Sequence, residues 1–167
     1  ARGYYDLHSA IAVRILTREP AEAVDPSLFR RRVARALALR RDLVRGTTGY
    51  RMVHGEADGL PGVVADRYGD FAVLKLYSAG LTPWRAAVVE ALRAEAAGLA
   101  GVFGRDEIPR DEEDDEAAPA GRVLWGAEPA GRIEIDEHGM KLLVDVRRGQ
   151  KTGFFLDQRE NRRLVRD

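Results

Sequence analysis

A run of residues near the C-terminal end of the chain carries side chains suited to binding chemistry. Residues 149–163 read GQKTGFFLDQRENRR and combine glycines, aromatic rings, a carboxamide and guanidinium groups. Carboxamides can read nucleobase edges, and guanidiniums pair with phosphates and carboxylates. Only four residues follow the run. We therefore expect the rest of any site to come from the preceding segment, from another chain or from further sequence, and the chain to be a piece of a larger protein.

The first part of this run has the composition of a tight turn. Gly149 and Gly153 permit backbone geometries closed to other residues, so the segment can bend sharply into a helix that begins near Asp157. Asp157 then stands where an N-cap belongs. Lys151 and Thr152 lie within the turn, in position to contact a phosphate or a cofactor carboxylate. The run is not a P-loop, because the strand, the first glycine and the spacing are absent.

The aromatic pair and the glutamine that follow have two readings each. Phe154 and Phe155 are adjacent, so on an extended segment one ring packs inward while the other faces a cleft and stacks on a planar ligand. The alternative is that both rings lie in the core. Gln158 can read an adenine edge or hold the amino acid end of a cofactor, or it is simply exposed on a helix face.

Arginine dominates the positive charge of the chain. Arg159, Arg162 and Arg163 are spaced three and four apart, so on a helix they share a face that can meet phosphate, or one that is only solvated. Residues 30–45 hold seven arginines against one aspartate, and residues 147–166 hold seven basic residues against two acidic ones. Such blocks fit RNA binding, but a GC-rich genome also produces them.

Composition excludes several classes of protein. The chain has 167 residues, 45% of them hydrophobic and 32% charged, with a net charge of zero. No stretch approaches the ~20 apolar residues of a membrane helix. The chain contains no cysteine, so it holds no disulfide, thiolate metal site or cysteine nucleophile. Its three histidines lack metal-ligand spacing with one another, and we expect no metal. Residues 1–5 lack an initiator Met and signal-peptide character, which predicts a start inside a longer polypeptide.

Periodicity and glycine or proline positions predict the elements that must hold these side chains. We expect a strand over 4–16, a linker over 17–24, a helix from 25 to 44, strands over 50–54, 62–65 and 71–77, a helix from 82 to about 98, short strands at 102–103 and 123–125, a solvated acidic loop over 106–116, a hairpin over 132–136 and 141–146, and a final helix from about 157. This order predicts an α/β (α+β) fold with a mixed, largely antiparallel sheet and flanking helices.

Three carboxylates in the middle of the chain are candidates for metal binding or for acid and base work. They are Glu56, Asp58 and Asp66, in and after a turn rich in glycine and proline. Turn capping and ion pairs with Arg51 or Arg67 are the more economical interpretation. We therefore assign no catalytic residue.

Three blocks together, residues 50–70, 144–146 and 149–163, resemble the class I S-adenosylmethionine-dependent methyltransferases that make 5-methylcytosine in large-subunit ribosomal RNA. The resemblance rests on the order and spacing of these blocks and covers nearly the whole chain. It implies three parts: the end of a PUA-like domain and a linker over 1–24, a central α/β domain over 25–146, and a motif and helix over 147–167 that lead into a Rossmann-like methyltransferase domain.

The resemblance also implies partners and a location. It implies S-adenosylmethionine as the cofactor, ribosomal RNA as the partner, no membrane association and a cytoplasmic location. The cofactor would contact Lys151, Thr152, Phe154, Phe155 and Gln158, and the RNA would contact Arg159, Arg162 and Arg163.

Two features of the family pattern are missing from these residues. The glycine-rich cofactor turn and the catalytic cysteine are absent, and attack through cytosine C5 needs a thiolate. We therefore expect the 167 residues alone to be inactive, and their exposed apolar surface to favour self-association. The alternative function is a non-catalytic module that binds RNA or protein through its arginine-rich helices.

Overall fold

The computed structural model describes residues 1–105 and 121–166, so the predicted acidic loop over 106–116 lies outside the described residues. The strands are β1 (Arg2–Tyr5), β2 (Val13–Thr17), β3 (Gly49–His54), β4 (Val63–Tyr68), β5 (Phe71–Leu76), β6 (Gly101–Gly104), β7 (Arg122–Gly126), β8 (Ile133–Glu137) and β9 (Met140–Val144). The helices are α1 (Pro26–Leu43), α2 (Arg85–Glu95) and α3 (Arg159–Arg166), with 3₁₀ turns η1 (Gly55–Asp58), η2 (Ala79–Trp84) and η3 (Leu156–Gln158).

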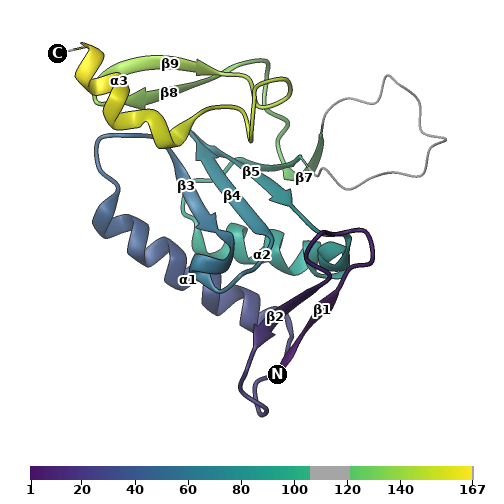
Figure 1. Ribbon diagram of the computed structural model, residues 1–167. Coiled ribbons are helices and arrows are strands. Elements are labelled where there is room, and N and C mark those ends of the chain that lie inside the picture. The colour runs from purple at the N-terminus through teal and green to yellow at the C-terminus, as the bar shows by residue number, and fades with distance from the viewer. Residues whose placement is uncertain (106–120, 167) are drawn as a thin grey trace.

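The main sheet has the strand order β3-β4-β5-β6-β7. Its pairs are antiparallel except β5 with β6, which are parallel because the chain crosses over through η2 and α2 between them. Two hairpins, β1–β2 and β8–β9, stand at opposite ends of the molecule with the two termini (Figure 1). The expected mixed, largely antiparallel sheet with helices is confirmed.

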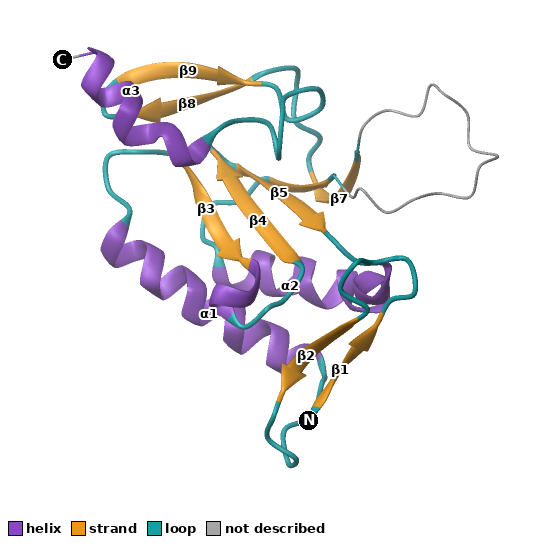
Figure 2. Ribbon diagram, viewed as in Figure 1, coloured by secondary structure: helices purple, strands orange, loops and turns teal. Residues whose placement is uncertain are grey.

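Both long helices cover one face of this sheet (Figure 2). Helix α1 begins where Asp25 Oδ1 accepts a hydrogen bond from the amide of Leu28 at 3.1 Å, with Pro26 in the first turn. Its apolar stripe and that of α2 pack on the strands, and Phe29 stacks on Trp84 with ring centres 5.2 Å apart. Within the described residues, neither of these helices nor α3 is long and apolar enough to cross a membrane.

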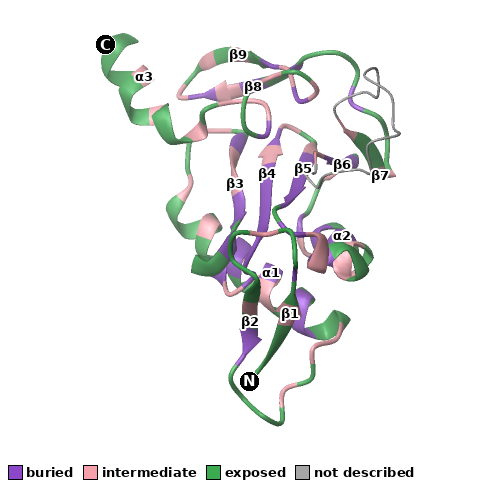
Figure 3. Ribbon diagram, turned by 45° about the vertical axis from the view of Figure 1, so that its right-hand side comes forward, coloured by how far each residue is buried: buried purple, intermediate pink, exposed green. Residues whose placement is uncertain are grey.

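The β8–β9 hairpin covers part of the opposite face. Tyr68, Val73 and Phe103 of the sheet form a second core with Ile135 and Val144 of the hairpin. Buried residues follow the central strands, whereas α3 is mostly exposed (Figure 3). Side chains alternate between the two faces along a strand. On the face that the hairpin covers only in part, the remaining side chains of β3, β4 and β5 carry the polar groups of the candidate site.

Two expected elements differ from the structure. Residues 4–16 form the hairpin β1–β2 and not one strand, because the Asp6 carboxylate accepts the amide of His8 and turns the chain. Thr82 and Pro83 do not begin the second helix; they lie inside η2, and α2 starts at Arg85. Local turn chemistry of this kind does not alter the apolar periodicity on which the predictions rested.

Candidate functional site

Residues 149–155, here called the motif loop, connect the β8–β9 hairpin to η3. A side chain at Gly149 would come closer than 3.0 Å to the carbonyl oxygens of Asp145 and Gly153, and Gly153 itself has φ of 139°. The Gly149 amide donates to Asp145 O at 2.9 Å, and the Arg105 guanidinium donates to Gly149 O at 2.6 Å. The predicted sharp bend is therefore present, and it depends on glycine at both positions.

A buried hydroxyl holds the motif loop to the sheet. Thr152 is 1% exposed and its Oγ1 lies 2.5 Å from Asp66 Oδ2 and 2.8 Å from the hydroxyl of Tyr68. An ionised carboxylate only accepts, so Thr152 donates to Asp66 and Tyr68 donates to Thr152. Burial, followed by the nearby Asp66 charge, raises the pKa of Tyr68 far above its usual range, which keeps this donor protonated.

Asp66 is fully buried and also receives a bidentate ion pair. Arg51 Nε and Nη2 donate to its two oxygens at 2.8 and 3.0 Å, and this hydrogen bonding raises the pKa of Arg51. Of the ion pairs expected between the three candidate carboxylates and Arg51 or Arg67, the one between Arg51 and Asp66 is present. The other Arg51 nitrogen, Nη1, lies 3.1 Å from His54 Nδ1. A guanidinium only donates, so that ring nitrogen is the acceptor.

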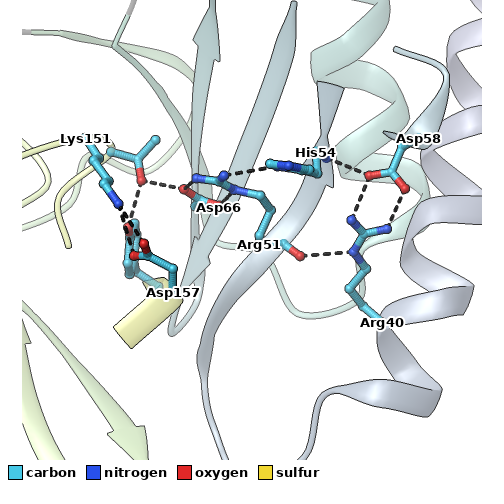
Figure 4. Close-up of polar contacts among 9 residues, drawn as sticks. Arg40, Arg51, His54, Asp58, Asp66, Lys151 and Asp157 are labelled. Carbon is cyan, nitrogen blue, oxygen red and sulfur yellow. Dashed lines mark hydrogen bonds and ion pairs between the residues drawn. The ribbon is translucent and has the colours of Figure 1, made fainter. Parts of the chain in front are cut away.

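A second ion pair extends this network to α1 (Figure 4). Arg40 donates to both oxygens of Asp58 at 2.6 and 2.7 Å, and Asp58 also accepts the His54 amide at 2.6 Å. Arg40 Nε donates to the carbonyl of Arg51 at 3.2 Å. The turn-capping role expected of Asp58 is confirmed, but Arg67 donates to backbone carbonyls instead of a carboxylate. Polar contacts therefore run from α1 to the motif loop.

Lys151 adopts a conformation that a non-glycine residue rarely takes. Its φ is 57°, its Nζ lies 3.0 and 3.1 Å from the two carboxylate oxygens of Asp157, and Nζ is 4.5 Å from the Phe155 ring centre. Left-handed backbone of this kind costs on the order of 1 kcal/mol and gathers at functional sites. The Thr152 contacts on the next residue hold it in place.

The N-cap predicted at Asp157 is wrong. Asp157 lies inside η3, its carboxylate caps no helix, and the hydrogen bond from Lys151 is the first cause that lowers its pKa. The reason is that one 3₁₀ turn precedes α3, so the helix starts two residues later than expected.

The aromatic rings divide between inside and outside, but the ring that lines the cleft beside the loop is the inner one, Phe154, and not the exposed Phe155. Phe154 packs against the second core with Arg162 4.4 Å over its ring, whereas Phe155 is 39% exposed. Gln158 is exposed, and its carbonyl oxygen accepts from Asn161 at 2.6 Å. Phe155 and Gln158 are thus exposed to solvent, while Thr152 and Phe154 hold the loop on the sheet and also line the cleft beside it.

The three arginines of α3 do not present one free face. Arg162 donates to both oxygens of the fully buried Glu137 at 2.7 Å and joins α3 to β8. Arg159 pairs with Glu160 at 3.2 Å, and Arg163 is half exposed, 3.9 Å from the same carboxylate. Of the three, Arg162 is the one committed to the interior.

A cleft of about 760 Å³ lies between the C-terminal half of α1 and the motif loop, over β3. Lys151, Thr152, Phe154 and Arg159 line it from the motif side, while sequence reasoning missed the other side, which includes Leu39, Leu43, Tyr50, His54 and Tyr77. A signal for Tyr77 was the alternation of residues 71–77. It places Tyr77 on the opposite face of the strand from the apolar residues Ala72, Leu74 and Leu76. Among the described residues, no three His, Asp or Glu side chains gather where they could hold a metal ion.

The comparisons with known proteins agree with this fold. No family model matches the chain. Ribosomal RNA large subunit methyltransferase I of Shewanella denitrificans is 44% identical over 166 residues, which is 98% of this chain and 41% of that protein. The enzyme of the same name from Escherichia coli is 40% identical over 168 residues, 99% of the chain and 42% of the relative. The chain therefore spans about two fifths of the length of these homologues.

Solved structures show the same fold. A protein of Streptococcus mutans assigned as a SAM-dependent methyltransferase superposes with a TM-score of 0.82 at 22% identity, over 98% of this chain and 41% of its own. A second structure, of a protein assigned as a methyltransferase and complexed with SAH, gives a TM-score of 0.77 at 24% identity over 90% of this chain and 37% of its own.

Proposed function

We propose that the chain is part of an S-adenosylmethionine-dependent methyltransferase that acts on large-subunit ribosomal RNA, with cytosine C5 as the methylated atom. The observation that carries this proposal is Lys151, which lines an open cleft in a strained conformation, with the exposed Phe155 ring 4.5 Å from its ammonium. Identity of 40–44% to the named homologues over nearly the whole chain supports it.

Each exposed group of the motif loop has a proposed role toward the cofactor. The Lys151 ammonium binds the cofactor carboxylate in place of Asp157, with which it now pairs. The Phe155 ring stacks on the adenine, and the Gln158 carboxamide bonds a polar edge. Thr152 keeps the loop in position through Asp66 and makes no ligand contact of its own through its hydroxyl.

The domain layout is also proposed. Five large apolar side chains on the β1–β2 hairpin are exposed: Tyr5, Leu7, Ile11, Val13 and Ile15. An exposed apolar face on a two-stranded hairpin fits burial against a PUA-like domain, of which residues 1–24 would be the last part. When that domain is not present, the same face would favour self-association of the 167 residues. Residues 25–146 would be the central domain, and 147–167 the entry to the catalytic one.

Lys151→Met is expected to weaken S-adenosylmethionine binding about 10- to 100-fold, because one charge-assisted contact is lost. Titration calorimetry on the protein made from the complete reading frame measures this. Lys141→Met is the matched control, since Lys141 lies on β9 in exposed pairs with Glu134 and Asp136. Equal affinity of Lys151→Met and wild type would remove Lys151 from the cofactor site.

Transfer of a tritiated methyl group to large-subunit ribosomal RNA tests the activity itself. The complete protein is expected to produce 5-methylcytosine, and the 167 residues alone to show no turnover, since they contain no cysteine to add to the base. Turnover by the 167 residues would refute that last point, and a different methylated base would refute the C5 assignment.

The arginine-rich face of α1 also supports the second function, a non-catalytic RNA-binding module. Arg31, Arg35, Arg41 and Arg45 are exposed along and just beyond α1. Binding of RNA that falls with salt, without any cofactor binding by the complete protein, would favour this module over the enzyme.

A further inference from the structure

The cleft carries an aromatic ring that the proposed cofactor wall does not use. Tyr77 directly follows β5, lines the cleft and is 46% exposed. Its amide donates to Gly62 O at 2.9 Å, and Lys75 Nζ lies 4.8 Å from its ring centre. A half-exposed ring whose backbone is held in this way offers a stacking surface at a small cost in conformational entropy.

Several cationic side chains line the cleft and could donate hydrogen bonds to an anionic ligand. Four cationic side chains line it against two carboxylates, an excess of two: Arg40, Arg51, Lys151 and Arg159 against Asp58 and Asp157. Counting the buried Asp66 behind Arg51 and the Glu160 carboxylate 3.2 Å from Arg159 balances the charge. The Arg51 side chain is still 33% exposed, and a phosphate could replace His54 as acceptor for its Nη1.

The face of α1 continues the cleft toward solvent. Leu39 and Leu43 line the cleft and are 51% and 68% exposed, and Arg35 lies one turn before them on the same face. Arg35 is exposed, and its guanidinium makes no hydrogen bond or ion pair with the residues that the structure describes. It is therefore placed to meet a phosphate that lies outside the cleft.

We propose that this cleft binds an unpaired nucleotide of the RNA, with its base stacked on Tyr77, its phosphate at Arg51 and a neighbouring phosphate at Arg35. The inference rests on the proposed RNA-directed function and specifies a single-stranded substrate segment. Aromatic stacking combined with guanidinium contacts is how proteins bind unpaired RNA.

Fluorescence anisotropy of the complete protein with a labelled RNA strand of about a dozen nucleotides tests the proposal. Tyr77→Ala is expected to weaken binding about 10-fold or more, and Tyr77→Phe to restore it, because phenylalanine keeps the ring. Arg35→Ala is expected to lower the slope of log affinity against log salt by about 0.7. Arg30→Ala, whose guanidinium pairs with Glu95 on the far side of α1 from the cleft lining, is the matched control.

The results of these binding measurements distinguish a failure of the nucleotide site from a failure of the proposed RNA-directed function. Unchanged affinity in Tyr77→Ala, or equal affinity for the blunt duplex of the same sequence, would overturn the cleft as a site for an unpaired base. Wild-type protein that binds no RNA even at low salt would instead overturn the proposed RNA-directed function. Loss of affinity in Tyr77→Ala with a native circular dichroism spectrum and recovery in Tyr77→Phe supports the inference.

Discussion

Replacement of Asp66 by alanine is expected to lower the free energy of unfolding by about 3 kcal/mol. Asp66 is fully buried and accepts from Arg51 and Thr152. Its removal leaves the Thr152 hydroxyl and part of a guanidinium without acceptors in a place that water reaches poorly. The Arg51 side chain is 33% exposed and keeps some hydration. The expected loss of stability is therefore at the lower end of the range of about 3–5 kcal/mol for breaking a buried ion pair. Urea denaturation with an unchanged m-value measures the effect.

The same substitution is expected to loosen the motif loop. Hydrogen exchange at the amides of Gly149 and Gly153 should quicken, because Thr152 no longer holds the loop on the sheet. Thr152→Val, which keeps the shape but lacks the donor, should give a smaller loss of about 1–2 kcal/mol. Glu134→Ala, on the exposed side of β8, is the control. Unchanged exchange in Asp66→Ala would show that the glycine turn alone holds the loop.

Replacement of Arg162 by alanine is expected to cost about 3–5 kcal/mol, because it leaves the carboxylate of Glu137 buried without its partner. Glu137 is 0% exposed and receives both of its side-chain hydrogen bonds from Arg162 at 2.7 Å among the described residues. The same arginine lies over Phe154, so α3 and the motif loop lose a shared contact. Thermal or urea unfolding measures the loss of stability.

A double-mutant cycle identifies the cause of that loss. Replacing both Arg162 and Glu137 by apolar residues should recover much of it, because no unpaired charge remains buried. Arg163→Ala, whose side chain is half exposed, should change stability little. Equal losses in the single Arg162 variant and in the double variant would point to packing on Phe154, and not to the ion pair, as the source.

Sequence reasoning succeeded where neighbours along the chain decide the structure. The alternation of residues 71–77 and the apolar stripe of α1 predicted a buried strand and a helix, and both are present. An ion pair of Arg51 or Arg67 with one of three nearby carboxylates was also expected, and the structure has Arg51 paired with Asp66, its cross-strand partner on β4. The hairpin β1–β2 and the extra turn η3 were missed, since neither changes the pattern of apolar residues.

By itself, the amino-acid sequence determined the local geometry of the candidate site. Glycines at 149 and 153 are needed for the bend of the motif loop, and adjacency puts the two phenylalanine rings on opposite sides of an extended backbone. These features depend on sterics within a few residues. Only the tertiary structure decided which of the site's polar groups are free.

Thr152 is bound to a carboxylate 86 residues away, Arg162 to one 25 residues away and Arg40 to one 18 residues away. The cleft is also formed by α1 and β3 together with the motif loop, which lies about a hundred residues further along the chain. Which side chains are buried and paired depends on how the sheet brings such segments together, and no spacing along the sequence records that. The run of glycines, aromatics and arginines therefore predicted a bent loop with an aromatic pair, but the pairing of its lysine, the exposure of one ring and the neighbouring cleft follow from the fold.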